Sequence, residues 1–323
     1  MNFTGLPDHG FCQLGAIKAS RIRRGLCTGW EKVTYVDDNA GYLHGFRTVI
    51  VDPQDPRAQA LLHLAADDVL QRVVDGLSKV GVRVLPVKGV VTAHQLYAEP
   101  WQRPIADIDV RIEPRHLGRV REAGRRAGWQ ELSWAPAYCN IVFDVSGIMV
   151  DVEGTIGPPG LCALSVEQML SRAKSTARGH DVPELHDHAL LLCVNAFKDK
   201  LVEAAPWSVE DLVRIVRQPG FDAGTFTERA REGRVVALVW IVADWLAKAR
   251  GDAIWGAIRD RLSHRPPRAL YRRLLARAVA KAPDGLAARV LTRIGADDPR
   301  MWARALGGAM AWQARVASRG RRG

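Results

Sequence analysis

The chain has 323 residues, 47% of them apolar and 25% charged, which is typical of a globular protein with a substantial core. Its formal net charge of +11 favours polyanionic partners such as nucleotide phosphates, RNA, DNA or an anionic membrane surface, although it can equally serve solubility. Five scattered cysteines without a CxxC pair exclude a disulfide framework and a zinc knuckle, and they indicate a reducing cytosol.

The chain shows no sign of export or membrane insertion. The first residues lack the basic and apolar regions of a signal peptide. The longest apolar run, 235–247, is too short to cross a bilayer and contains Asp244. We therefore expect a cytoplasmic protein with no membrane partner, and we leave its oligomeric state open.

The first predicted elements surround a Lys-Gly pair. Residues 1–55 are rich in turn-forming residues and form a leader without an assignable role, apart from a short strand pattern at 48–53. Apolar residues at helical spacing then predict a helix from Pro56 to Gly81. The next strand, 82–87, leads directly into Lys88-Gly89, and a second helix follows from near Val90 to before Pro100.

Three further strands and a helix complete a small α/β unit. A strictly alternating strand covers 106–112, and a helix runs from Glu113-Pro114 to Gly128. Strands at 137–145 and 147–156 are joined by Ser146-Gly147, which predicts an antiparallel hairpin. The order helix, strand, helix, strand, helix, strand, strand predicts a mixed sheet.

The rest of the chain is predicted to be helical. An amphipathic stretch at 165–178 precedes a series of helices that begins at His186, with prolines supplying the breaks. The triplet His186-Asp187-His188 invites a metal reading, but capping of the helix by Asp187 is the simpler account. The predicted domains are a catalytic domain at 56–182 and a helical domain at 183–316, followed by a basic tail at 317–323.

Two aspartates on the strand 106–112 are the most informative pair in the chain. Ala106, Ile108, Val110 and Ile112 are predicted to face one side of the strand, and Asp107, Asp109 and Arg111 the other. Carboxylates two residues apart on one face can share a divalent cation, and their oxygens suit Mg²⁺ or Mn²⁺. Two solvated surface acids are the alternative, but Asp is depleted in strands.

A second acidic strand supplies the further carboxylates that a two-metal site needs. In the segment 149–153, Val150 and Val152 are predicted to face the core, and Asp151 and Glu153 the opposite side. If the two acidic strands are neighbours, their carboxylates can hold two cations for phosphoryl transfer.

These residues resemble a known family. The segments VKGVVTAHQLY (87–97), RPIADIDVRIEP (103–114) and VDVEG (150–154) are similar to the uncharacterised nucleotidyltransferase family of the DNA polymerase β-like superfold. The resemblance covers roughly residues 60–250 and is most specific between Lys88 and Arg111. It implies an α/β (α+β) core with a mixed sheet, followed by an all-helical C-terminal domain that closes the nucleotide cleft.

The resemblance also implies roles for single residues. Asp107 and Asp109 match the metal-binding pair, and Asp151 matches the third carboxylate, which is a general base or a further metal ligand. Gly89 lies where the superfold usually has a Gly-Ser turn against the triphosphate, and the Lys88-Gly89 pair found here agrees with the narrower family. Glu153 stands where relatives often have His, so it is either an additional metal ligand or a rim residue.

Several cationic residues are candidates for the triphosphate. Lys88 can place positive charge on the phosphates or be an exposed residue at the end of a strand. Arg103 can clamp a phosphate oxygen or form a structural salt bridge to one of the acids. The superfold often contributes a Lys from the segment 195–200, and Lys198 is the candidate. Asp211 corresponds to a family Asp with a structural role, and Trp101 can stack on a base or belong to the core.

Other chemistries are not supported, because the motifs of phosphate-loop enzymes, dinucleotide-binding proteins, α/β-hydrolases and zinc proteases are absent. The predicted activity is Mg²⁺- or Mn²⁺-dependent transfer of NMP from an NTP, with ATP as the default, and two metal ions are expected. The acceptor is open between an RNA end such as that of tRNA, a small molecule and a peptide natural product. A non-catalytic nucleotide- or RNA-binding module that keeps the fold is the alternative.

Overall fold

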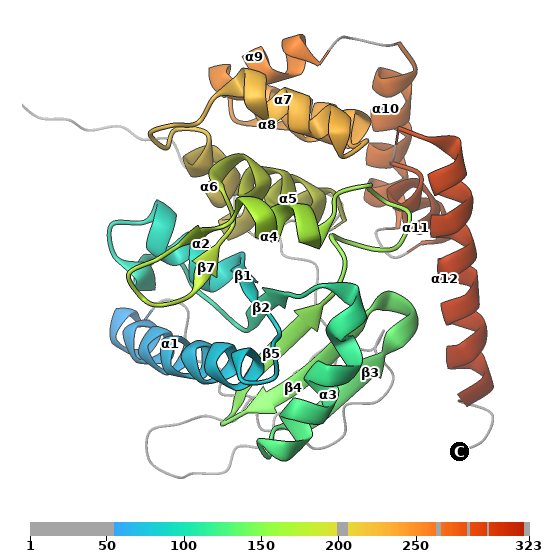
Figure 1. Ribbon diagram of the computed structural model, residues 1–323. Helices are drawn as coiled ribbons and strands as arrows, with labels where there is room; N and C mark the ends of the chain where they lie inside the picture. Colours follow the sequence, from blue (N-terminus) through green and yellow to red (C-terminus); the bar gives the residue numbers. More distant parts are fainter. Residues whose placement is uncertain (1–54, 199–205, 263–265, 283–284, 296, 320–323) are drawn as a thin grey trace, which may run out of the picture.

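The computed structural model describes residues 55–198, 206–262, 266–282, 285–295 and 297–319. The described chain forms a five-stranded sheet with helices on one face and a large helical part beside its β1 edge (Figure 1). The strand pattern at 48–53 and nearly all of the leader lie outside the described residues. No helix in these ranges is both long enough and apolar enough to span a membrane.

The sheet is mixed. Its strands are ordered β1-β2-β5-β4-β3, with β2 and β5 parallel and every other neighbouring pair antiparallel. The strands are β1 (Leu85–Val87), β2 (Ile108–Arg111), β3 (Gln130–Ala135), β4 (Asn140–Val145) and β5 (Ile148–Glu153). A separate two-stranded ribbon pairs β6 (Lys174–Ser175) with β7 (Asp181–Val182).

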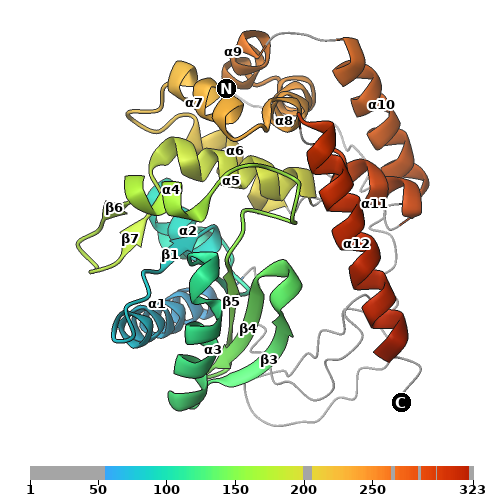
Figure 2. The same cartoon turned by 45° about the vertical axis from the view of Figure 1, so that its right-hand side comes forward.

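One face of the sheet is covered by α1 (Pro56–Ser78) and α3 (Leu117–Arg126), which lie beside it in both views (Figures 1 and 2). Helix α1 begins at Pro56 because the Asp55 side chain accepts a hydrogen bond from the Arg57 amide and Pro56 needs no amide partner. Its buried face joins a core with the sheet that includes Ile108, Val110, Val150 and Val152, each with no exposed surface. The alternating pattern thus predicted the buried face correctly for these four residues.

The β4–β5 hairpin is confirmed at Ser146-Gly147, where both residues have positive φ angles of 58° and 85°. The structure corrects three other points in this region. Ala106 is exposed and precedes β2, and β3 was missed because Gln130–Ala135 lacks a clean apolar alternation. Residues 136–138 form the short 3-10 helix η3 (Pro136–Tyr138), so β4 begins three residues later than predicted.

Short helices connect the strands at the edge of the sheet that faces the helical part. Helix α2 (Gly89–Leu96) follows β1, and the 3-10 helix η1 (Pro100–Gln102) lies between α2 and β2. A second 3-10 helix, η2 (Pro114–His116), opens the segment that continues as α3. The predicted amphipathic stretch at 165–178 is helical only over α4 (Val166–Arg172), after which the chain forms β6.

The second half of the described chain is helical, as predicted, and the fold class is confirmed. Its own apolar core also takes in Leu85 and Val87 of β1, which joins it to the sheet. Helix α12 runs along the outside in both views (Figures 1 and 2). The helices are α5 (Leu185–Lys198), α6 (Pro206–Ile215), α7 (Ala223–Glu232), α8 (Val236–Ala249), α9 (Ala253–Arg261), α10 (Pro266–Lys281), α11 (Leu286–Arg293) and α12 (Pro299–Arg319).

The predicted capping of α5 by Asp187 is wrong. Glu184 accepts the His186 amide at 3.0 Å, while Asp187 lies inside the helix with no exposed surface. Arg172 donates to both carboxylate oxygens of Asp187 at 2.8 and 2.9 Å. This ion pair connects α4 to α5 and satisfies the buried carboxylate. The domain boundaries at 182/183 and 316/317 stay a prediction.

Gly124 on α3 offers a test of the packing between α3 and the sheet. A β-carbon at this position would lie 2.7 Å from the Phe143 ring and 2.9 Å from Trp129. Both rings are held by their own edge-to-face contact, with centroids 5.5 Å apart. We expect Gly124→Ala to lower the free energy of unfolding by about 1–3 kcal/mol, measured by urea denaturation. Gly118→Ala on the same helix is the control and should not destabilise, because no described residue beyond the adjoining turns of α3 lies within 4 Å of the added carbon.

Candidate active site

The three predicted acids are brought together by the pairing of β2 with β5. In this parallel pair, Asp109 lies directly opposite Asp151, and Arg111 lies opposite Glu153. Asp107 immediately precedes β2. Side chains at paired positions share one face of the sheet, so these groups project away from α1 and α3 and toward the helical part of the chain. The arrangement expected from the sequence is therefore present in the backbone.

Lys88 lies on this acidic face. Its ammonium Nζ is 2.5 Å from Oδ1 of Asp109, and the two side chains are only 14% and 9% exposed. Lys88 reaches this position from the end of β1, which pairs with β2 so that Val87 lies opposite Asp109. The nearly dry contact makes Lys88 the main counterion of Asp109.

The other two carboxylates on β5 also have partners. The Asn140 amide on β4 donates to Oδ1 of Asp151. The Arg111 guanidinium on β2 lies 2.5 Å from Oε2 of Glu153. The ion pair with Arg111 favours the role of a rim residue for Glu153 over that of a metal ligand.

Helix α2 points its N-terminus into the same region. Lys88 occupies its N-cap position without a capping side chain, so the first backbone N–H groups of α2 are available to an anion. A β-carbon on Gly89 would lie 3.2 Å from Nη1 of Arg103 and 3.3 Å from the Ile105 side chain. Gly89 is buried, and the absence of a side chain lets Arg103 and Ile105 approach the start of α2 this closely.

Arg103 is held by Asp211 of α6 rather than by an acid of the sheet. Its Nε and Nη2 atoms donate to Oδ2 of Asp211 at 3.2 and 2.8 Å, and Nη1 donates to the Pro104 carbonyl at 2.7 Å. The Tyr97 hydroxyl donates to the other oxygen of Asp211 at 2.9 Å. These contacts favour the structural role considered for Arg103, with a partner that differs from the predicted one.

The charges around the acids shift their pKa values in opposite directions. Burial and the Asp109 carboxylate raise the pKa of Asp107 to about 6. Burial, together with Glu153 and Asp109, raises the pKa of Asp151 to about 7. Burial alone would raise the pKa of Asp109 as well, but Lys88 and Arg111 outweigh it and hold that pKa below its usual value. Extra positive charge on this face would therefore be stabilising above neutral pH.

Asp151→Asn tests this electrostatic strain. Because the folded-state pKa of Asp151 lies above its ordinary 3.8, the ionised carboxyl destabilises the fold at pH 8, and the penalty disappears as pH falls through about 7 toward 4. We expect the variant to be more stable than the wild type at pH 8 by on the order of 2 kcal/mol in EDTA. The difference should shrink toward zero by pH 4.5, as followed by urea denaturation. A difference that does not vary with pH would contradict the shift.

The donor set fits magnesium or manganese, although it is not assembled as a closed ligand cage. Asp107, Asp109 and Asp151 offer only hard carboxylate oxygens, the ligands that these ions prefer. Among the residues that the structure describes, no three His, Cys, Asp or Glu side chains already converge on one cation position. Two of the three carboxylates instead have the nitrogen partners described above, Lys88 and Asn140.

Lys198, the remaining predicted phosphate ligand, also reaches this region. It is the last residue of α5, it is half-buried, and its charge lowers the pKa of both Asp107 and Asp109. Trp101 is 38% exposed in η1 and is not part of the core. His186 and His188 contact Glu184 and Gln95 respectively, which gives the triplet a structural role.

Two residues of the site, Asn140 and Arg111, were not predicted from the sequence. Asn140 was not considered, although its position two and four residues before Val142 and Asp144 places it on one face of β4 with them. Arg111 was placed on the acidic face but given no function. Its Nε atom is buried and has no hydrogen-bond partner among the residues that the structure describes, while its Nη2 atom pairs with Glu153.

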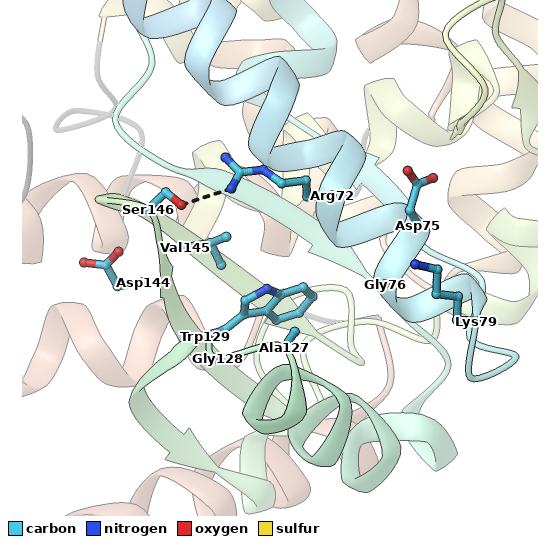
Figure 3. Close-up of a pocket in the computed structure, with 10 residues that line it drawn as sticks. All are labelled: Arg72, Asp75, Gly76, Lys79, Ala127, Gly128, Trp129, Asp144, Val145 and Ser146. Atoms are coloured by element: carbon cyan, nitrogen blue, oxygen red, sulfur yellow. Dashed lines mark hydrogen bonds between the residues drawn. The ribbon is translucent and has the colours of Figure 1, made fainter.

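A separate cavity of about 410 Å³ lies between the C-terminal part of α1, the turn after α3 and the β4–β5 turn (Figure 3). Arg72 bridges it by donating to the Ser146 hydroxyl at 3.1 Å, and the Trp129 indole forms part of its wall. Asp107, Asp109, Asp151 and Glu153 do not line this cavity. It therefore does not belong to the candidate active site.

A mixed sheet with three carboxylates on one face, followed by a large helical part, is the arrangement expected of a nucleotidyltransferase. The chain belongs to the uncharacterised nucleotidyltransferase family, whose model matches residues 55–250. This confirms the resemblance found in the sequence. No curated protein matches the chain.

Two solved structures are similar to the chain at low identity, and both are of the antibiotic-resistance factor ANT(2'')-Ia. Its solution structure is 12% identical with a TM-score of 0.39, and the match covers 53% of this chain and 94% of that one. Its crystal structure with adenylyl-2''-tobramycin is 11% identical with a TM-score of 0.38, and the match covers 61% and 98% of the two chains.

Proposed function

We propose that the protein transfers NMP from an NTP to a nucleophile on an acceptor, with release of pyrophosphate, and that the reaction depends on Mg²⁺ or Mn²⁺. The observation that supports this most directly is the pairing of Asp109 with Asp151 across β2 and β5, with Asp107 beside them. A divalent cation held there would neutralise charge on the phosphates and favour in-line displacement.

The protein's own residues would divide the work as follows. Asp107 and Asp109 hold the cations, and Asp151 holds one of them or accepts the proton of the attacking hydroxyl. The N-terminus of α2 at Gly89 has no capping side chain and would bind the phosphates through backbone N–H groups, and Lys88 and Lys198 would add positive charge. Arg103 keeps the loop before Asp107 in place by binding Asp211.

ATP is the default donor. The acceptor is an RNA end, a small molecule or a peptide, and the net charge of +11 favours an anionic acceptor over a cationic one. RNA binding would weaken steeply with added salt, whereas the binding of a small neutral acceptor would hardly change.

The proposal is tested by incubating the full chain with Mg²⁺, cell extract and ATP labelled on either the α- or the γ-phosphate. Transfer of NMP puts the α-label on a component of the extract and releases the γ-label as pyrophosphate. Labelling of a component by γ-ATP alone would indicate a kinase instead. The same experiment with the other NTPs identifies the donor, and fractionation of the extract identifies the acceptor.

A non-catalytic nucleotide-binding module is distinguished by calorimetry. An active enzyme should bind an NTP more tightly with Mg²⁺ than without it, because the cation would bridge the carboxylates and the phosphates. A module that no longer uses the acids should show no such dependence. The retention of all three acids on one face of the sheet favours the enzyme.

A further inference from the structure

Lys88 has a second role besides binding the phosphates, which is to neutralise Asp109. We infer that its ammonium group stands in for a divalent cation on Asp109 until a nucleotide binds, so that metal and nucleotide bind in a mutually dependent way. The inference rests on the proposed function, since it concerns the same carboxylates. It adds a property of the free protein that can be measured without any acceptor.

The first observation is the contact itself. Nζ of Lys88 lies 2.5 Å from Oδ1 of Asp109, in a region where the two side chains are 14% and 9% exposed. Asp107, Asp151 and Glu153 are close enough for their charges to act on Lys88 or on Asp109. The ammonium contacts Asp109 directly, and a metal ion that uses this oxygen of Asp109 must displace it.

The second observation is the backbone of Lys88. Its φ of 53° and ψ of −131° lie in a region that residues with a β-carbon rarely adopt and that glycine adopts readily. The carbonyl of Lys88 is fixed in this conformation by the Thr92 amide at 2.6 Å and the Thr92 hydroxyl at 2.9 Å. A strained lysine where glycine would fit better indicates that the side chain is needed at this point.

The third observation is the choice of partners open to Lys88 once it is displaced. Glu153, another acid near it, is already bound by Arg111. The phosphates of a nucleotide at the N-terminus of α2 would supply a new anion next to Lys88, which is the N-cap residue of that helix. Metal binding in the absence of nucleotide therefore leaves a half-buried ammonium group poorly paired, whereas nucleotide relieves this cost. By thermodynamic reciprocity, metal must strengthen nucleotide binding by the same factor.

The test measures Mn²⁺ binding to the full chain by electron paramagnetic resonance, with and without the non-hydrolysable analogue α,β-methylene-ATP. We expect Lys88→Met to bind Mn²⁺ about tenfold more tightly than the wild type when no nucleotide is present, a typical coupling factor. The analogue should strengthen Mn²⁺ binding by the wild type much more than by the variant. Lys79→Met, which removes an exposed lysine at the end of α1, is the matched control and should behave as the wild type.

The outcomes separate the inference from the proposed function. Equal Mn²⁺ affinities of the wild type and Lys88→Met without nucleotide, or weaker binding by the variant, would overturn the inference and leave the metal site standing. Absence of Mn²⁺ binding by every protein, with and without the analogue, would overturn both. Lys88→Gly provides a second variant in case Lys88→Met fails to fold, because it removes the charge and also relieves the backbone at φ 53°. It should show the same tightening of Mn²⁺ binding.

Discussion

Asp109→Asn is expected to lower the rate of NMP transfer at least about 1,000-fold, which corresponds to roughly 4 kcal/mol of transition-state stabilisation. Asn keeps the shape of Asp and can still accept a hydrogen bond from Lys88, but it offers a cation no negative charge. Because Asp109 pairs directly with Asp151 in the sheet, its loss removes the centre of the proposed metal site. Transfer of the α-phosphate label from ATP to the acceptor measures the rate.

Two further measurements make this result interpretable. Asp68→Asn removes an exposed acid of α1, whose side chain is 68% exposed and paired only with Arg72 four residues later among the described contacts. This control variant should retain the wild-type rate. Circular dichroism should show that Asp109→Asn keeps the fold, and Asp107→Asn should give a similarly large loss of activity. Near-normal turnover by a folded Asp109→Asn protein would refute the proposed site.

Asp211→Ala is expected to lower the free energy of unfolding by about 3–5 kcal/mol. Asp211 has no exposed surface, and its partner Arg103 is only 13% exposed. Removing the carboxylate leaves Nε and Nη2 of Arg103 and the Tyr97 hydroxyl without their acceptor in a region that water barely reaches. Chemical denaturation of the full chain, monitored by tryptophan fluorescence, measures the loss.

The neighbouring residue provides the matched control for this ion pair. Glu210 binds Arg214 one turn along the same helix, but these side chains are 37% and 41% exposed. Glu210→Ala should therefore cost no more than about 1 kcal/mol. Equal losses for the two variants would mean that burial of the Arg103–Asp211 pair does not matter. If Asp211→Ala left stability unchanged, Arg103 would be free to serve the phosphates as originally predicted.

Sequence patterns predicted the structure correctly where it depends on neighbouring residues in the chain. The period of two in 108–112 and 148–153 correctly separated the buried valines and isoleucines from the acids, because successive side chains of a strand point to opposite faces. The same reasoning failed at Gln130–Ala135, where β3 is a partly exposed edge strand without a clean apolar alternation. The capping role predicted for Asp187 falls to Glu184, because a capping preference does not reveal that a distant arginine binds Asp187.

By itself, the sequence determined which side chains share a face, where the hairpin turns and which family the chain resembles, since these depend on neighbours in the chain. Only the tertiary structure decided that β2 lies beside β5, that Lys88 covers Asp109 and that Arg103 binds an aspartate 108 residues away. Such contacts are selected by the packing of the whole sheet against the helices. Strand partners and buried counterions are chosen by the total free energy of the fold, which no local pattern contains.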